Sequence, residues 1–266
     1  MKTIKIFVAS SEELISERRE ISDMIAHLNY TLNKLDINIL LVKWEFLDAS
    51  MGPKHKQEEY NEELKECEIC IVLYWTRFGL YTKIELDTAY EQLKSKGNPR
   101  KLYVYFKESD REVTPELQAF RNSFPSVYGH FFCIFRNEDA LKSHFLLQFI
   151  DYQNTLLKNS GLIELHDSKV FLDGRPFINL NNVAFVGNNE EYNNLLKQIK
   201  TTRKLLSVSE ISDSEYSEYA QELQNLLKRQ QEIEESLWQT ALTITRLRNT
   251  AGSERLQHAI ELFEKG

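Results

Sequence analysis

The sequence predicts an α/β fold: a five-stranded parallel sheet flanked by helices, followed by a β-hairpin connector and an α-helical C-terminal region. In the first part of the chain, five short β-rich runs alternate with segments of helical spacing, a pattern typical of parallel strands covered by helices. A turn pair, Asp173-Gly174, marks the hairpin, and apolar residues recur at helical spacing from residue 190 onward. We therefore expect an α/β domain over residues 1–157, a hairpin linker over 158–187 and a helical region over 188–266.

Local signals place the boundaries of the predicted elements. Ser10 and Ser11 precede the acidic start of the first helix, as N-cap residues do. Gly97 and Pro99 follow the third helix in the order expected at a helix end, and Pro115 stands in the first turn of the fourth. We predict strands at residues 4–9, 37–46, 69–75, 102–106 and 131–135, and helices at residues 14–32, 57–66, 84–96, 115–122 and 139–158.

The rest of the chain changes character. Short β-like runs at residues 163–165 and 169–172 form the hairpin, and Pro176 restricts its second arm to a sheet edge. A long helix at 213–249 carries a heptad-like apolar stripe, which fits an oligomeric coiled-coil seam or an ordinary antiparallel helical hairpin. Residues 256–266 resemble half of a helix pair, so we expect the natural chain to continue into repeat helices. The stripe consists of Tyr216, Tyr219, Leu223, Leu226, Gln230, Ile233 and Leu237.

Composition narrows the functional classes. The formal net charge of −7 argues against nucleic-acid binding as the main function, although a local basic groove stays possible. The chain has 3 cysteines, begins directly with a strand and has no apolar run of the roughly 20 residues that a membrane helix needs. We expect a cytoplasmic protein in a reducing compartment, with no membrane partner.

Two groups of residues bear on metals and nucleotide cofactors. Cys67 and Cys70 form a single C-x-x-C pair without a second pair at zinc spacing, so we interpret them as buried small hydrophobes and expect no metal. The chain contains neither a phosphate-binding G-x-x-x-x-G-K-[ST] loop nor a G-x-G-x-x-G fingerprint. NTP hydrolysis and dinucleotide redox chemistry are therefore unsupported.

The strongest functional signal follows the third predicted strand. That strand runs into an aromatic loop with Trp75, Phe78 and Tyr81, and the carboxylate of Glu85 follows early in the next helix. Open α/β sheets bind ligands outside the carboxyl ends of their strands. The three aromatic side chains would stack a flat ring, and the helix N-terminus would favour the ionised form of Glu85. The alternative is that Glu85 is a solvated surface residue.

Other residues fall on the same predicted rim. Ser10 and Ser11 would hydrogen-bond a ligand phosphate or ribose, or would serve only as N-caps. Trp44, at the end of the second strand, would stack a ligand or lie in the core. Arg18 and Arg19 would form an ion pair at the core edge or anchor the Glu85 loop.

Several segments of the first domain resemble a known protein family. The segments Lys5-Ile6-Phe7-Val8-Ala9-Ser10-Ser11, Glu17-Arg18, Trp75-x-x-x-Gly79 and Glu85-Leu86-x-x-Ala89 resemble a prokaryotic TIR (Toll/interleukin-1 receptor) domain, of the kind fused to helical or repeat sensor modules in bacterial immune proteins. The resemblance covers residues 3–155 and implies a TIR/flavodoxin-like fold. The lead-in Thr82-Lys83-Ile84 departs from the family's Ser-x-Trp-Cys pattern.

The resemblance also implies a function. It implies an NAD⁺ glycohydrolase that cleaves the nicotinamide–ribose bond with Glu85 as the catalytic residue, so that NAD⁺ is a substrate and not a cofactor. It further implies activation by self-association through the TIR domain and the C-terminal helices, so that residues 188–266 form an assembly or sensor-coupling region. A possible downstream sensor domain and a role as an effector of bacterial antiphage defence are implied as well. The alternatives are a catalytically silent TIR-like scaffold and an enzyme that resembles nucleoside deoxyribosyltransferases.

Overall fold

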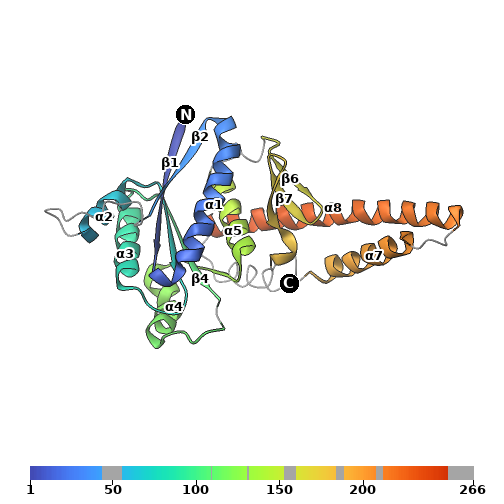
Figure 1. Ribbon diagram of the computed structural model, residues 1–266. Helices are drawn as coiled ribbons and strands as arrows, with labels where there is room; N and C mark the ends of the chain where they lie inside the picture. The colour runs from blue at the N-terminus through green and yellow to red at the C-terminus, as the bar shows by residue number, and fades with distance from the viewer. Residues whose placement is uncertain are drawn as a thin grey trace. The chain divides into compact units, whose positions relative to one another are not determined.

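The computed structural model describes residues 1–43, 56–108, 110–130, 132–152, 160–183, 189–207 and 212–250 (Figure 1). The chain forms two compact units, Met1–Leu141 and Lys142–Gly266, and each is described by itself. The predicted site residue Trp44 and the predicted C-terminal helix half at 256–266 lie outside the described residues.

The first unit contains the predicted parallel sheet. Its strands are β1 (Lys2–Ser10), β2 (Ile37–Val42), β3 (Ile69–Tyr74), β4 (Lys101–Lys107) and β5 (Cys133–Phe135). All four neighbouring pairs are parallel, and the strand order is β2-β1-β3-β4-β5, which confirms the predicted fold class. Every residue of β3 is buried, as its unbroken apolar sequence leads one to expect for a central parallel strand.

Helices cover the sheet of the first unit. Figure 1 shows the strands between α1 on one side and α3 and α4 on the other. On the α3 side, one apolar cluster joins the strands to Leu64 of α2, Leu86 and Ala89 of α3, and Phe124 of α4. The helices of the first unit are α1 (Ile15–Leu32), α2 (Lys56–Glu66), α3 (Leu80–Lys94) and α4 (Pro115–Tyr128). The division between the two units falls within α5 (Glu138–Tyr152).

Within the described residues, the α3 and α4 helices differ most from their predicted bounds. The α3 helix begins at Leu80, four residues before the predicted start at 84, because Gly79 already serves as its extended N-cap. The α4 helix continues past Pro125 to Tyr128 and ends at Gly129, whose φ of 64° is the left-handed conformation of a helix stop. Pro125 lies in the last turn of α4, where the loss of one backbone donor does not end the helix.

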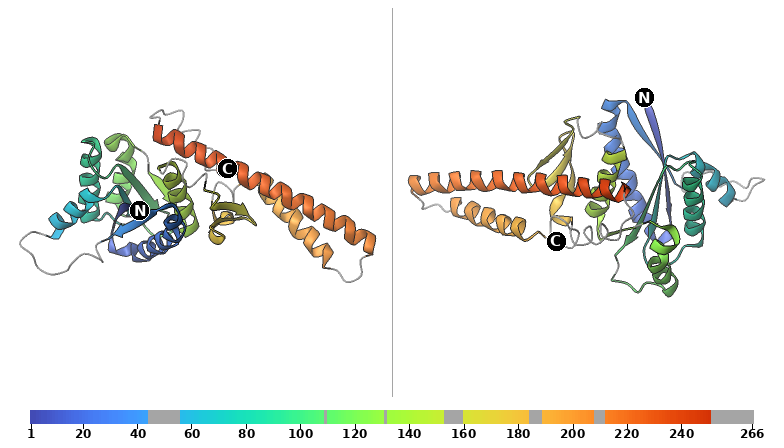
Figure 2. Two further views of the ribbon diagram at one scale, coloured as in Figure 1. Left: turned by 90° about the horizontal axis from the view of Figure 1, so that it is seen from above. Right: turned by 180° about the vertical axis from the view of Figure 1, so that it is seen from behind.

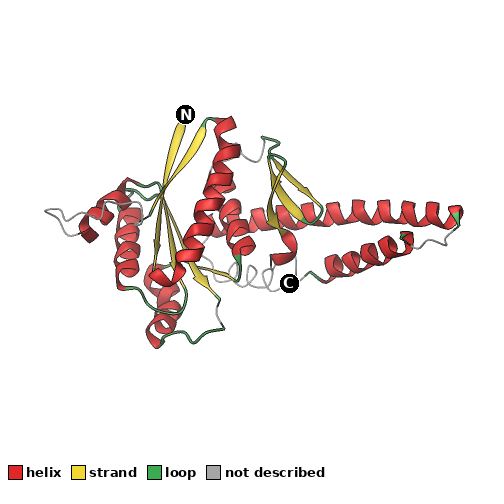
Figure 3. Ribbon diagram, in the orientation of Figure 1, coloured by secondary structure: helices red, strands yellow, loops and turns green. Residues whose placement is uncertain are grey.

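The second unit contains a small antiparallel sheet (Figure 3). Its strands are β6 (Ile163–His166), β7 (Lys169–Leu172) and β8 (Arg175–Asn179), in the order β6-β7-β8. The predicted turn at Asp173-Gly174 joins β7 to β8, and a second turn at Asp167-Ser168 joins β6 to β7. All four turn residues have φ between 52° and 72°, as tight hairpin turns require. The predicted hairpin therefore gains a third strand, and Pro176 lies on the edge strand β8.

Two helices complete the second unit. The α7 (Glu190–Leu206) and α8 (Asp213–Thr250) helices run side by side, as Figures 1 and 2 both show. Most of the predicted stripe of α8 is buried or half-buried, whereas Tyr216 is 54% exposed. This intramolecular contact corresponds to the helical-hairpin alternative, and self-association stays a prediction. Among the described residues, no helix combines the length and apolar character needed to cross a bilayer.

Candidate active site

The candidate site lies at the carboxyl ends of β1 and β3. The strand order reverses between these two neighbours, which is the position where open α/β sheets bind ligands. The start of α3 closes in on the loop after β1: a Cβ added to Gly79 would lie 3.5 Å from the Cβ of Ser11 and 2.9 Å from Oγ1 of Thr82. Glycine therefore permits a close approach between the two loops at this point.

Glu85 points into the protein from the second turn of α3. It is 7% exposed, so it is not a solvated surface residue. Burial raises its pKa from 4.5 to about 7, against a hydrogen bond from the Gln57 side chain and the positive charge of Arg18, which both lower it. We expected the helix N-terminus to favour the ionised form of Glu85, but desolvation outweighs the favourable interactions and shifts the pKa towards the protonated form.

Arg18 is a buried cation beside this site. Its side chain, 1% exposed, donates from Nη1 to Oγ of Ser10 at 2.7 Å and to the carbonyl oxygen of Ser11 at 2.8 Å. Arg18 thus anchors the loop after β1, and the Ser10 hydroxyl accepts from Arg18 at the rim where we expected Ser10 to bind a ligand. In the sequence, Arg18 interrupts the apolar spacing of the first helix, and that interruption is a signal for a buried cation.

Trp75 has cations over its ring. Nζ of Lys107 lies 4.1 Å from the ring centroid and Cζ of Arg111 lies 4.5 Å from it, both within cation–π range. Lys107 also forms an ion pair with the buried carboxylate of Glu17. Trp75 is half-buried, and its ring already has partners within the protein.

The other two predicted stacking residues lie in different environments. Phe78 packs into the apolar cluster on the α3 side, stacked on Tyr74 at 6.2 Å between centroids and edge-on to Phe120 at 5.0 Å. Tyr81 is 59% exposed on the first turn of α3. The structure therefore leaves Tyr81 as the solvent-facing ring of the predicted aromatic loop.

Sequence reasoning missed two residues of the site. Gln57, near the start of α2, hydrogen-bonds Glu85, and Glu13, in the short 3₁₀ helix Glu12–Leu14, hydrogen-bonds the loop after β3. Both occur in polar stretches where many side chains are solvated, so the sequence contains no pattern that would single them out.

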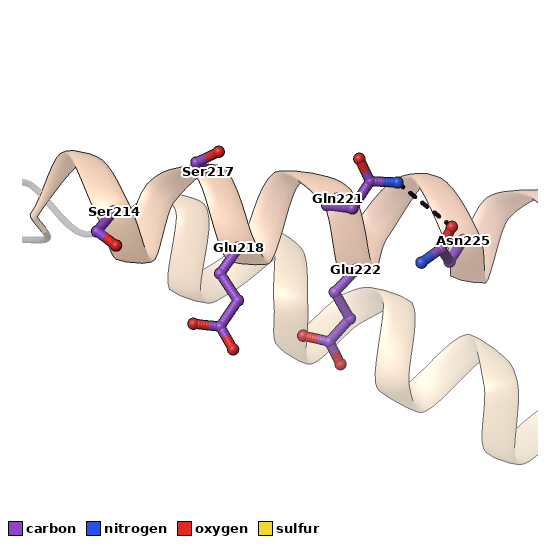
Figure 4. A pocket seen from close by; sticks show the side chains of 6 residues that line it. All are labelled: Ser214, Ser217, Glu218, Gln221, Glu222 and Asn225. Carbon is purple, nitrogen blue, oxygen red and sulfur yellow. Dashed lines mark hydrogen bonds between the residues drawn. The ribbon is translucent and has the colours of Figure 1, made fainter.

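The other features bear on alternative sites. Cys67 and Cys70 are fully buried, as expected, and burial raises the pKa of the Cys67 thiol to about 12. Within the described ranges, no group of three or more His, Cys, Asp and Glu side chains is arranged to hold a metal ion. Two shallow hollows are lined by residues other than Glu85. One follows the exposed face of α8 (Figure 4), and the other lies at the amino ends of β1, β3 and β4.

Comparisons with known proteins give distant similarities. No protein-family model matches the chain. Protein MGF 100-3L of African swine fever virus is 26% identical over 135 residues, which are 51% of this chain and 80% of the viral protein. The structure of the CMP N-glycosidase BcmB of Clostridium botulinum aligns with 54% of this chain and 98% of its own, at 18% identity and a TM-score of 0.35. At these values, neither similarity assigns an activity or a residue role.

Proposed function

We propose that the first unit cleaves the N-glycosidic bond of a nucleoside or nucleotide, with Glu85 as the catalytic residue. The observation that carries this proposal is a buried carboxyl group with a pKa of about 7, beside Gln57 and Arg18 at the strand-order reversal. A group that titrates near the working pH is suited to proton transfer.

In the proposed reaction, Glu85 donates a proton in the first step and regains a proton in the second. Glu85 in its protonated form donates to the nitrogen of the leaving base as the bond from that nitrogen to C1′ breaks. Positive charge then develops on the sugar, and the new Glu85 carboxylate stabilises it. Water adds to C1′ and returns its proton to Glu85, which completes hydrolysis to free base and sugar.

The pKa of Glu85 separates two substrate classes. A neutral nucleoside needs its leaving base protonated, whereas the nicotinamide of NAD⁺ leaves without a proton. A carboxyl group that remains protonated near neutral pH therefore favours the nucleoside or nucleotide class, the alternative that resembles deoxyribosyltransferases. NAD⁺ cleavage, as the TIR resemblance implies, is the rival outcome, for which the carboxylate form alone would serve.

The test is a substrate panel read out by mass spectrometry. Purified protein is incubated with CMP, AMP, cytidine, deoxyadenosine and NAD⁺ across pH 5.5–8.5, as buffer conditions chosen to bracket the pKa of about 7. We expect release of free base from a nucleoside or nucleotide, with a rate that falls as pH rises through about 7. Release of nicotinamide with a rate that rises over the same interval would select NAD⁺, and turnover of no substrate would select the silent scaffold.

Self-association, a downstream sensor and a role in antiphage defence stay predictions from the resemblance. Turnover measured over a range of protein concentrations tests the first of them, because activation by assembly makes specific activity rise with concentration.

A further inference from the structure

Glu13 bridges the loops that follow β1 and β3. Its Oε1 accepts hydrogen bonds from the backbone N–H of Thr76 at 3.1 Å and of Arg77 at 3.3 Å, and from the Ser11 hydroxyl at 3.2 Å. Its Oε2 accepts from the Thr76 hydroxyl. We call these four donors, two backbone N–H groups and two hydroxyls, the anion cradle.

The anion cradle lies where a ligand of this fold is expected. Ser10 at the end of β1 is in register with Leu73 near the end of β3, so the two loops emerge side by side. Between these strands the sheet order reverses. The cradle therefore spans the crevice position of an open α/β sheet, and an acidic side chain of the same chain occupies it.

The donors of the cradle match a phosphoryl group. Successive backbone N–H groups and hydroxyls bind carboxylate and phosphate oxygens by the same geometry, and charge on the acceptor strengthens each bond. Arg18 adds positive charge to the same loop, because its guanidinium donates to the carbonyl oxygen of Ser11. A phosphoryl group offers more acceptor oxygens than the carboxylate that now fills the cradle.

We propose that the anion cradle binds the phosphoryl group of a nucleotide substrate, and that Glu13 is an internal occupant that this group displaces. The inference rests on the proposed function and narrows its substrate class to nucleotides over nucleosides. Displacement of Glu13 also releases the link that this side chain forms between the two loops.

The test measures anion binding directly. Isothermal titration with inorganic phosphate compares wild type with Glu13→Ala and Glu13→Gln, with Glu12→Ala as the control, because Glu12 is the exposed neighbour that carries the same charge. We expect Glu13→Ala to bind phosphate about tenfold more tightly, Glu13→Gln to gain less, and Glu12→Ala to match wild type. Addition of Thr76→Val to Glu13→Ala, which deletes one donor, should remove much of the gain.

A purely structural bridge predicts the opposite result. Loss of Glu13 would then lower the melting temperature without any gain in phosphate affinity in either variant, and that result overturns the proposal. Glu13→Gln keeps the shape and one acceptor, so it remains informative if Glu13→Ala does not fold. Phosphate is not cleaved, so a gain in affinity without base release would retain the cradle and reject the proposed activity. Base release without a gain in phosphate affinity would reject the cradle and retain the proposed activity.

Discussion

Glu85 of the first unit and Glu234 of the second unit are both buried, and the two side chains are held differently. Glu234 of α8 is 1% exposed, and its Oε1 accepts from the Tyr192 hydroxyl at 2.6 Å and from Nε2 of Gln230 at 2.8 Å. Ser168 joins the same network by accepting from Gln230 at 2.7 Å, which links α8 to the β6–β7 turn. Glu85 is also buried, but it lies at the loop end of a parallel sheet and is held by Gln57 beside the cation Arg18.

The difference shows that burial of a carboxyl group does not by itself mark a reactive site. The Glu234 network connects three elements of the second unit through neutral donors, which is the arrangement of a packing contact. Glu85 instead combines burial, a nearby cation and the carboxyl edge of a strand-order reversal, where a substrate is expected. Under the proposed function, position in the fold is what distinguishes Glu85 from Glu234.

The largest expected effect is on catalysis. Glu85→Gln should lower kcat/KM for base release by about 10²–10⁴-fold, because the amide cannot donate a proton in the reaction. Glu234→Gln, the matched change in the second unit, should leave kcat/KM within about threefold of wild type. Initial rates of base release, measured at saturating and at limiting substrate concentrations, give kcat and kcat/KM for both variants. Equal losses in both would remove the distinction between the two glutamates.

Glu85→Gln should also change the free energy of unfolding in a pH-dependent way. Glu85 ionises near 4.5 in the unfolded chain and near 7 in the folded protein, so its ionisation destabilises the fold increasingly between these pH values and fully above about 7. Glu85→Gln should therefore raise the free energy of unfolding by up to about 3 kcal/mol at pH 8, with a much smaller gain near pH 5. Urea denaturation at both pH values measures this. A gain in unfolding free energy that does not depend on pH would contradict the raised pKa of Glu85.

Tyr192 tests the Glu234 network without a change of charge. Tyr192→Phe removes the hydroxyl that hydrogen-bonds both Glu234 and Ser168. The substitution should lower the free energy of unfolding by about 1–3 kcal/mol and leave the pH profile of base release unchanged. Tyr216→Phe removes the same hydroxyl from an exposed ring and should change stability very little. Similar costs at the two positions would argue against a buried network.

The smallest expected effect comes from Gln57. Its hydrogen bond lowers the pKa of Glu85, so Gln57→Leu should move the falling limb of the pH–rate profile to higher pH. At pH 7.5 we expect a rise in rate of no more than about two- to threefold. Asn61→Ala, which removes the other hydrogen-bond partner of the Gln57 side chain, is the control and should leave the limb in place. A limb that moves to lower pH would contradict the hydrogen bond by which Gln57 lowers the pKa of Glu85.

The sequence by itself determined the order of elements and the position of Glu85. Alternating apolar runs and helical segments predicted the five parallel strands, because those patterns depend on local chemistry and burial. The tertiary structure decided what surrounds Glu85: Arg18 of α1 and Gln57 of α2 lie far from Glu85 in the sequence and interact with it in the fold. It also placed Glu13 across the loops that follow β1 and β3. Desolvation also reversed the expected charge preference of Glu85, since the cost of burying a charge depends on packing around it and not on neighbours in sequence.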